Sequence, residues 1–209
     1  MNALPRTLLQ IAGAALHPGP LERSVLVLID AQLEYVDGAV PLAGIGAAVR
    51  EARRLLDLAR AQAVPVFHVV HHGREGAPAF DPLGRHAAII PELAPVDGEA
   101  VVVKSLPNAF AGTDLQRLVR DAGRDELVIA GFATHMCVSA TTRAALDLGF
   151  RCTVVADATA TRDLPHPLGR GVTPAAVVHE GTLAALADRF AVVVADVDAL
   201  VAGGGSPRG

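Results

Sequence analysis

Short apolar runs alternate along the chain with longer segments of helical apolar spacing. The apolar runs are unbroken stretches rich in Val, Ile and Leu, which is typical of strands buried on both faces of a parallel sheet. They cover residues 24–29, 66–70, 100–103, 127–129, 151–156 and 190–194. The helical segments cover residues 4–16, 41–63, 112–122, 137–149 and 174–188. Strands that alternate with helices predict βαβ units, hence an α/β protein whose mostly parallel sheet is covered on both faces.

A single domain accounts for this pattern. The chain has 209 residues, of which 51% are hydrophobic and 19% charged, enough apolar material for one well-buried core. No internal repeat or interdomain linker interrupts it. We expect one domain over residues 1–202, which opens with a short helix, and a disordered tail over residues 203–209, because the sequence GGGSPRG offers nothing to pack.

The charge balance limits the possible partners. A formal net charge of -4 and a pI near 6.0 provide no basic surface for nucleic acid or an anionic membrane. No apolar run approaches the length of a membrane span, and the N-terminus lacks the pattern of a secretory signal. The two cysteines, Cys137 and Cys152, are too few for a disulfide framework. We therefore expect a cytoplasmic protein that binds a small molecule, with no nucleic-acid or membrane partner.

Three chemically useful side chains follow predicted strands: Asp30, Lys104 and Cys137. Ligands of parallel α/β sheets bind beyond the carboxyl ends of the strands, where these residues meet. Cys137 can attack as a thiolate, while Asp30 moves the proton and Lys104 holds both by charge and hydrogen bonding. Each also has a purely structural interpretation. Asp30 can cap a turn, Lys104 can be a solvated loop cation, and Cys137 can be a small core residue. Asp157, at the end of the fifth predicted strand, competes for the acid role.

Cys137 is predicted to lie in the first turn of a helix that ends near Gly149. Gly131 marks the end of the preceding strand, and Thr134 can cap the helix. The positive end of the helix dipole favours a thiolate and lowers the thiol pKa below its usual value of about 8.5. Unpaired N–H groups of the same turn can stabilise an oxyanion.

Three motifs together resemble the isochorismatase-like cysteine hydrolases. They are Asp30-x-Gln32 with Tyr35, then Lys104, then Gly131-x-x-Thr134-x-x-Cys137-Val138. That group includes nicotinamidases, carbamoylsarcosine amidases, ureidoacrylate amidohydrolases and isochorismatases. The resemblance spans residues 24–194 and implies a three-layer αβα, Rossmann-like fold with a six-stranded parallel sheet. It also implies a homo-oligomer, a dimer or a tetramer.

The resemblance assigns roles to individual residues. The catalytic triad maps onto Asp30, Lys104 and Cys137. A cis, non-proline peptide bond is implied between Phe132 and Ala133. Its use is to direct the N–H groups of Ala133 and Cys137 at one oxyanion, which makes these two residues the implied oxyanion hole.

The histidines of the second strand depart from one branch of this family. Nicotinamidases share an Asp-x-His motif that, together with a further His, binds a metal. Here the region reads FHVVHH and has no such Asp. We therefore predict no catalytic metal and no cofactor. Whether His68, His71 and His72 bind a cation or line the pocket stays open, as does whether the segment 71–99 is a lid.

Candidate substrate-binding residues lie next to the triad in sequence. Apolar or aromatic groups beside a few polar ones are typical of a small-molecule site. Core positions are an equal alternative for Phe110 and Met136. The candidates are Gln32, Tyr35, Phe110, His135 and Met136.

The predicted function is hydrolysis of a small amide or ureide C–N bond through a thioester on Cys137. A second hypothesis is vinyl-ether hydrolysis of an isochorismate-like substrate with Asp30 as general acid. Retention of Cys137 favours the first. A third is a non-catalytic or redox protein that uses Cys137 as an oxidisable thiol. Retention of both Asp30 and Lys104 argues for catalysis, because a sensor needs only the thiol.

Overall fold

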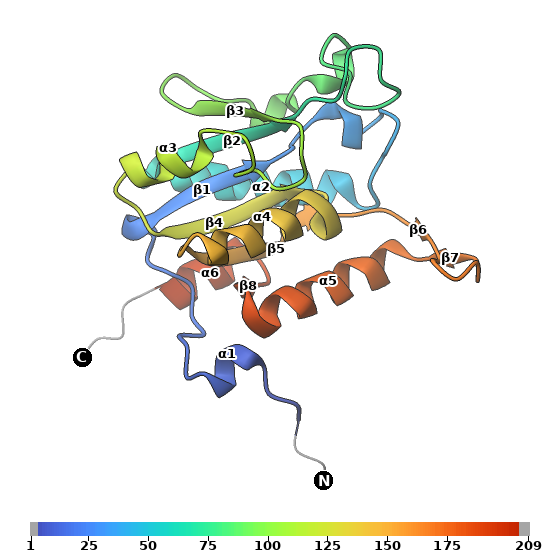
Figure 1. The fold of residues 1–209 in the computed structure, drawn as a ribbon. Helices are drawn as coiled ribbons and strands as arrows, with labels where there is room; N and C mark the ends of the chain where they lie inside the picture. Colours follow the sequence, from blue (N-terminus) through green and yellow to red (C-terminus); the bar gives the residue numbers. More distant parts are fainter. Residues whose placement is uncertain (1–3, 205–209) are drawn as a thin grey trace.

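A six-stranded, all-parallel sheet forms the centre of the molecule (Figure 1). The computed structural model describes residues 4–204. The strand order is β3-β2-β1-β4-β5-β8, and every neighbouring pair is parallel. The predicted α/β class and six-stranded parallel sheet are confirmed. The strands are β1 (Ser24–Ile29), β2 (Val66–His71), β3 (Ala100–Lys104), β4 (Glu126–Phe132), β5 (Arg151–Ala160) and β8 (Val192–Val194).

Helices cover both faces of the sheet, so that the fold has three layers (Figure 1). One face carries α2 (Ile45–Ala61) and α6 (Val197–Gly204), and the other carries α3 (Leu115–Asp121), α4 (Ser139–Asp147) and α5 (Ala175–Arg189). Short 3-10 turns lie in the connections, at Leu21–Arg23, Leu33–Tyr35, Arg85–Ala87 and Pro91–Leu93.

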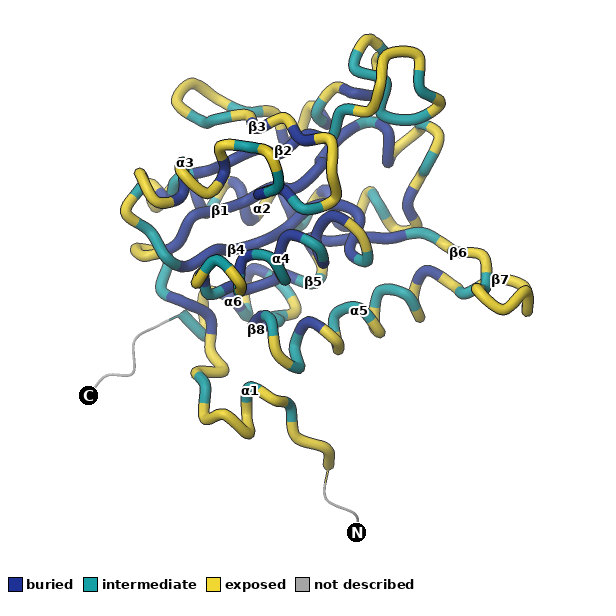
Figure 2. The backbone as a smooth tube through the Cα atoms, viewed as in Figure 1, coloured by how far each residue is buried: buried dark blue, intermediate teal, exposed yellow. Residues whose placement is uncertain are grey.

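Strand β1 shows why the apolar runs are continuous. All six of its residues are buried, and their side chains alternate between the two faces. Leu26 and Leu28 join the core beneath α2, whereas Val25, Val27 and Ile29 join the core beneath α3 and α4. A strand with a core on each side has no polar face, which is what the unbroken run indicated. Figure 2 shows this burial along the central strands.

The ends of the chain differ from the prediction. Helix α1 is only Leu8–Ile11, one turn closed by a capping box between Thr7 and Gln10, rather than residues 4–16. Helix α6 was not predicted, and it extends to Gly204. Gly203 lies so close to Pro18 that a Cβ would be 2.7 Å from its ring. Ordered structure therefore continues past the predicted start of the tail at residue 203, and residues 205–209 lie outside the described part.

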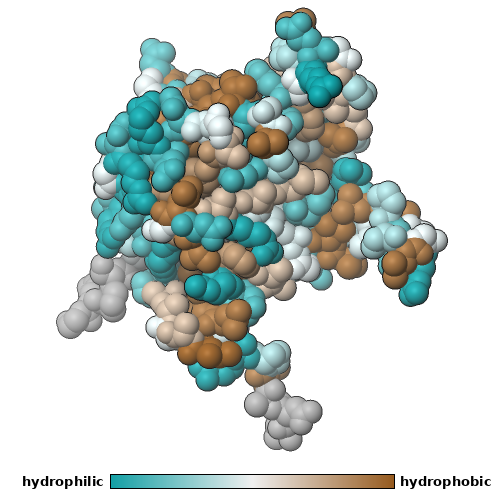
Figure 3. Space-filling model, viewed as in Figure 1, coloured by the Kyte–Doolittle hydropathy of each residue, from teal (hydrophilic) through white to brown (hydrophobic). Residues whose placement is uncertain are grey.

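Two further differences concern the C-terminal half. Strand β5 continues to Ala160, so Asp157 lies within it and is exposed rather than ending it. A small antiparallel hairpin of β6 (Leu164–Pro165) and β7 (Val172–Thr173) projects from the body (Figure 1). Figure 3 shows hydrophobic atoms on this projecting hairpin, where Leu168 and Val172 are exposed. Among residues 4–204, no helix combines the length and apolar character that crossing a membrane requires.

Candidate active site

The structure brings Asp30, Lys104 and Cys137 together at the carboxyl edge of the sheet. Lys104 Nζ lies 2.8 Å from Asp30 Oδ2 and 3.2 Å from Cys137 Sγ. Asp30 follows β1, Lys104 ends β3, and Cys137 follows β4 by a short turn. Because β2 and β4 flank β1 on opposite sides, the chain reverses its winding direction between β1 and β4, which is where such sheets bind ligands.

Asp30 has an unusual backbone and one free oxygen. Its φ is +49°, a left-handed conformation that Asp tolerates better than most residues. Its N–H donates to Val69 O at 2.8 Å, which ties the turn to β2. Oδ1 is buried and has no hydrogen-bond partner in the described part of the chain. Burial raises the pKa of Asp30, while the charge of Lys104, the nearby Cys137 thiol and the hydrogen bond from Lys104 lower it.

Cys137 lies in a π-helical turn, Thr134–Val138, that precedes α4. This corrects the expectation of an α-helix capped by Thr134, since the Thr134 hydroxyl instead lies 3.0 Å from His179 Nδ1. Burial and the negative charge of Asp30 raise the pKa of the Cys137 thiol to about 12, although Lys104 lowers it. This direction is opposite to the predicted lowering of the thiol pKa by the helix dipole.

The peptide bond between Phe132 and Ala133 is cis. The Ala133 N–H has no backbone acceptor within residues 4–204. Burial raises the pKa of the nearby Tyr35 phenol, and the Ala133 amide lowers it. An amide without a backbone acceptor can serve as an oxyanion donor.

The predicted pocket residues fall into different environments. Tyr35 is buried beside the site, with its ring edge-on to Phe132 at 6.1 Å between centroids. His135 Nδ1 lies 2.5 Å from Thr161 Oγ1 at the edge of the same turn. Met136 points outward and is 47% exposed. Of these three predicted residues, Tyr35 is thus the one enclosed against the site.

Gln32 and Phe110 are occupied elsewhere. The Gln32 amide donates to His71 O at 3.0 Å and Ala87 O at 2.9 Å, and its carbonyl accepts from His71 N at 2.8 Å. Gln32 therefore fixes backbone rather than offering a free group to a ligand. Phe110 stacks on Phe150 at 5.8 Å with an interplanar angle of 14°, in the core beneath α3 and α4. The contacts of Phe110 are therefore those of a core residue, the alternative to a substrate-binding role.

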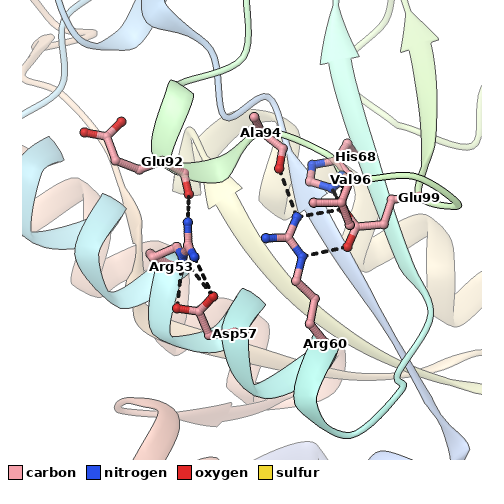
Figure 4. Close-up of polar contacts among 8 residues, drawn as sticks. All are labelled: Arg53, Asp57, Arg60, His68, Glu92, Ala94, Val96 and Glu99. Atoms are coloured by element: carbon pink, nitrogen blue, oxygen red, sulfur yellow. Dashed lines mark hydrogen bonds and ion pairs between the residues drawn. The ribbon is translucent and has the colours of Figure 1, made fainter.

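The three histidines do not form a cluster. His68 Nε2 lies 2.8 Å from a Glu99 oxygen, and Arg60 contacts the same carboxylate (Figure 4). His71 instead points to the triad, with Nδ1 3.1 Å from Lys104 Nζ. The carboxylate beside His68 was missed because Glu99 lies 31 residues away in sequence. Among the described residues, no group of three or more His, Cys, Asp or Glu is arranged to hold a metal.

Two residues near the site had no sequence signal. Phe80, in the long segment after β2, has a φ of +55° and packs edge-on against both Tyr35 and His71, at 5.4 and 4.9 Å. The buried Glu34 accepts a hydrogen bond from Phe80 N at 2.9 Å and holds the segment there. Glu34 lies in the 3-10 turn Leu33–Tyr35. From the sequence alone, a single acidic residue in a short turn is predicted to be exposed.

The amino-acid sequence matches the isochorismatase domain model over residues 24–196, which is most of the chain. The chain belongs to the isochorismatase family. It is 40% identical over 175 residues to a secreted isochorismatase effector of Verticillium dahliae, covering 84% of this chain and 89% of that protein. Its fold matches the crystal structure of an isochorismatase from Pseudomonas putida with a TM-score of 0.87 and 43% identity, covering 92% and 97% of the two chains.

Some isochorismatase-family relatives are named for amide hydrolysis. A maleamate amidohydrolase of Pseudomonas putida is 33% identical, covering 69% of this chain and 76% of that protein. An N-carbamoylsarcosine amidase of Arthrobacter is 29% identical, covering 52% of this chain and 47% of that protein. The family is hydrolytic, and it includes enzymes that cleave C–N bonds.

Proposed function

We propose that this isochorismatase-family protein is a cysteine-dependent hydrolase of a small amide or ureide. The observation that carries the proposal is the buried ammonium of Lys104 between Asp30 Oδ2 and Cys137 Sγ, with Asp30 Oδ1 left free. A free carboxylate oxygen beside a protonated thiol is a base placed to take its proton. The family relatives named as amidases support the choice of reaction.

The reaction proceeds in two halves. Cys137 Sγ adds to the substrate carbonyl while its proton passes to Asp30, and the N–H groups of Ala133 and Cys137 hold the oxyanion. The C–N bond then breaks, and the amine leaves with the proton from Asp30. In the second half, Asp30 takes a proton from a water molecule while the oxygen of that water attacks the thioester. The products are the acid and the amine, and the thiol is regenerated when its sulfur regains that proton.

Because burial and the charge of Asp30 raise the pKa of the Cys137 thiol, the proposed route couples attack by sulfur to proton transfer. A preformed thiolate is not needed, since Asp30 accepts the proton as the C–S bond forms. Lys104 stabilises negative charge on either partner throughout.

Intact-protein mass spectrometry during incubation with a panel of small amides and ureides tests the proposal. We expect a substrate-dependent adduct with the wild type and none with Cys137→Ala. Cys152→Ala is the matched control, because Cys152 is also a buried free thiol but lies within β5. Full turnover by Cys137→Ala would refute the thioester route.

Vinyl-ether hydrolysis remains the second candidate. The observation in its favour is the effect of burial on Asp30, which raises the carboxyl pKa and suits a general acid. It predicts that Cys137→Ala retains activity on an isochorismate-like ether while Asp30→Asn loses it. A redox role for Cys137 predicts peroxide-driven sulfenate formation with no hydrolysis of any amide. The predicted cytoplasmic location and homo-oligomer stay predictions.

A further inference from the structure

The ammonium of Lys104 has three partners, one for each of its protons. Besides Asp30 Oδ2 and Cys137 Sγ, the third is His71 Nδ1, at 3.1 Å. An ammonium carries three donors and no acceptor, so Nδ1 can only accept from it. An Nδ1 that accepts carries no proton, and a neutral ring then has its proton on Nε2.

The surroundings of His71 maintain the neutral ring. Burial, the positive charge of Lys104 and the neighbouring His72 together lower its pKa to about 4. Lys104 faces the ring from β3, and His72 follows it in the chain. Phe80, from the irregular segment after β2, contacts the His71 ring edge-on and carries no charge. Protonated His71 would place a second cation against Lys104.

The position of the ring is fixed independently of any substrate. Gln32 binds both the N–H and the C=O of His71, at 2.8 and 3.0 Å, so the backbone cannot shift. The ring packs edge-on against Phe80, with centroids 4.9 Å apart. His71 and Lys104 are also register neighbours on adjacent parallel strands. These contacts hold Nδ1 of His71 in place without any contribution from Asp30 or Cys137.

We propose that His71 is a positioning residue, whose Nδ1 accepts a hydrogen bond from Lys104 and so holds the ammonium between Asp30 and Cys137. The inference rests on the proposed thiol chemistry and adds a fourth member to it. Without this acceptor, one proton of Lys104 is left without a partner in a buried site, and the ammonium turns away from Sγ toward other oxygen acceptors. The thiol then loses the positive charge that favours its ionised form.

Two substitutions separate this role from packing. Asn places its carbonyl oxygen near the position of Nδ1, whereas Gln places its polar atoms near Nε2 and leaves Lys104 without an acceptor. The measurement is the rate of Cys137 alkylation by iodoacetamide, followed by mass spectrometry in a Cys152→Ala background. We expect His71→Gln to slow alkylation by about tenfold or more, and His71→Asn to stay within about threefold of the parent. His17→Asn, which changes an exposed histidine outside the site, is the control and should leave the rate unchanged.

Nuclear magnetic resonance of protein labelled with 15N-histidine provides a readout that needs neither substrate nor reagent. We expect the His71 signal, assigned by its loss in His71→Asn, to show an unprotonated Nδ1 and a protonated Nε2 from neutral pH down to about pH 5. A proton on Nδ1, or equal alkylation rates for the Asn and Gln variants, would overturn the inference. These outcomes do not depend on turnover. A wild type that forms no adduct with any amide contradicts the proposed function, and the nitrogen spectrum still decides the role of His71.

Discussion

The carboxylate of Asp30 and the ammonium of Lys104 form an ion pair of 2.8 Å in which neither side chain has any exposed surface. Removing two charges from water costs several kcal/mol for each, and a buried pair often contributes less than apolar residues of the same size. The presence of this pair at the edge of the sheet is therefore not explained by stability. The proposed thiol chemistry accounts for it, because the pair sets the charge beside Cys137.

Removal of Lys104 alone should destabilise the protein strongly. Lys104→Met leaves the Asp30 carboxylate buried and unpaired, so we expect the free energy of unfolding to fall by about 3–5 kcal/mol. The double variant Asp30→Asn with Lys104→Met has no buried charge and should recover more than half of that loss. Urea denaturation at neutral pH measures both. A double variant no more stable than the single one would show that packing, rather than charge, causes the loss.

The sequence predicts the triad because Asp30 and Lys104 lie at strand ends and Cys137 lies in the turn after a strand. The strands read as unbroken apolar runs, so reactive polar side chains just beyond them are conspicuous. Asp30, Lys104 and Cys137 could therefore be placed at one edge without coordinates. The state of the thiol could not, because its pKa is set mainly by burial, which depends on how the segments around it close.

Contacts between distant segments account for most of what the sequence did not predict. Phe80 reaches the site from an irregular segment, and its anchor Glu34 lies 46 residues earlier. Strand β5 continues to Ala160 because distant segments supply its partners: Asp157 N donates to Ala195 O at 2.9 Å, and Gly131 of β4 lies opposite Thr159. From the sequence alone, without knowledge of the partner strand, these polar residues are predicted to form a loop.

Gly131 should be irreplaceable at its place in β4. Its φ is +110°, and a Cβ built there would lie 2.0 Å from Ile29 O on β1. Gly131→Ala must therefore separate the two strands that carry Asp30 and Cys137, and we expect a loss of at least about 3 kcal/mol in unfolding free energy. Gly123→Ala is the control, because Gly123 has a φ of +68° but no atom within 4 Å of the added Cβ. It should cost about 1 kcal/mol, from backbone conformation alone.

Glu34 should fix the position of the long segment over the site. Its two oxygens accept from Ala39 N at 2.5 Å and Phe80 N at 2.9 Å, and the residue is 3% exposed. Glu34→Gln replaces one acceptor by an amide group that cannot accept, so we expect a loss of about 1–3 kcal/mol and release of the segment. Limited trypsin digestion at the exposed Arg74 measures the release. Glu92→Gln, an exposed change in the same segment that leaves the cleavage site intact, should digest like the wild type.

The Arg60, Glu99 and His68 contacts anchor the far end of that segment (Figure 4). Arg60 donates to both oxygens of Glu99, at 2.8 and 2.9 Å, and to Ala94 O at 2.9 Å. Burial alone raises the pKa of Glu99, but hydrogen bonds from Arg60, His68 and Val96 outweigh it and lower the pKa to about 2. Burial lowers the pKa of His68, against the opposing effect of Glu99, so its ring is neutral beside the carboxylate. The cluster therefore links the attachment of the segment to pH.

The sign of this pH dependence follows from the direction of each shift. The folded protein favours ionised Glu99, so its contribution is complete above the ordinary pKa of 4.5 and is lost as pH falls toward about 2. Neutral His68 contributes in the same direction at higher pH, because the unfolded chain takes up its proton first as pH falls below 6.5. We expect Glu99→Gln to be less stable than the wild type at neutral pH and to lose stability less steeply between pH 4.5 and 2. Urea midpoints across that range measure the difference, and the exposed Glu92→Gln should follow the wild type. If the curves of Glu99→Gln and the wild type run parallel there, the carboxylate does not carry the acid sensitivity.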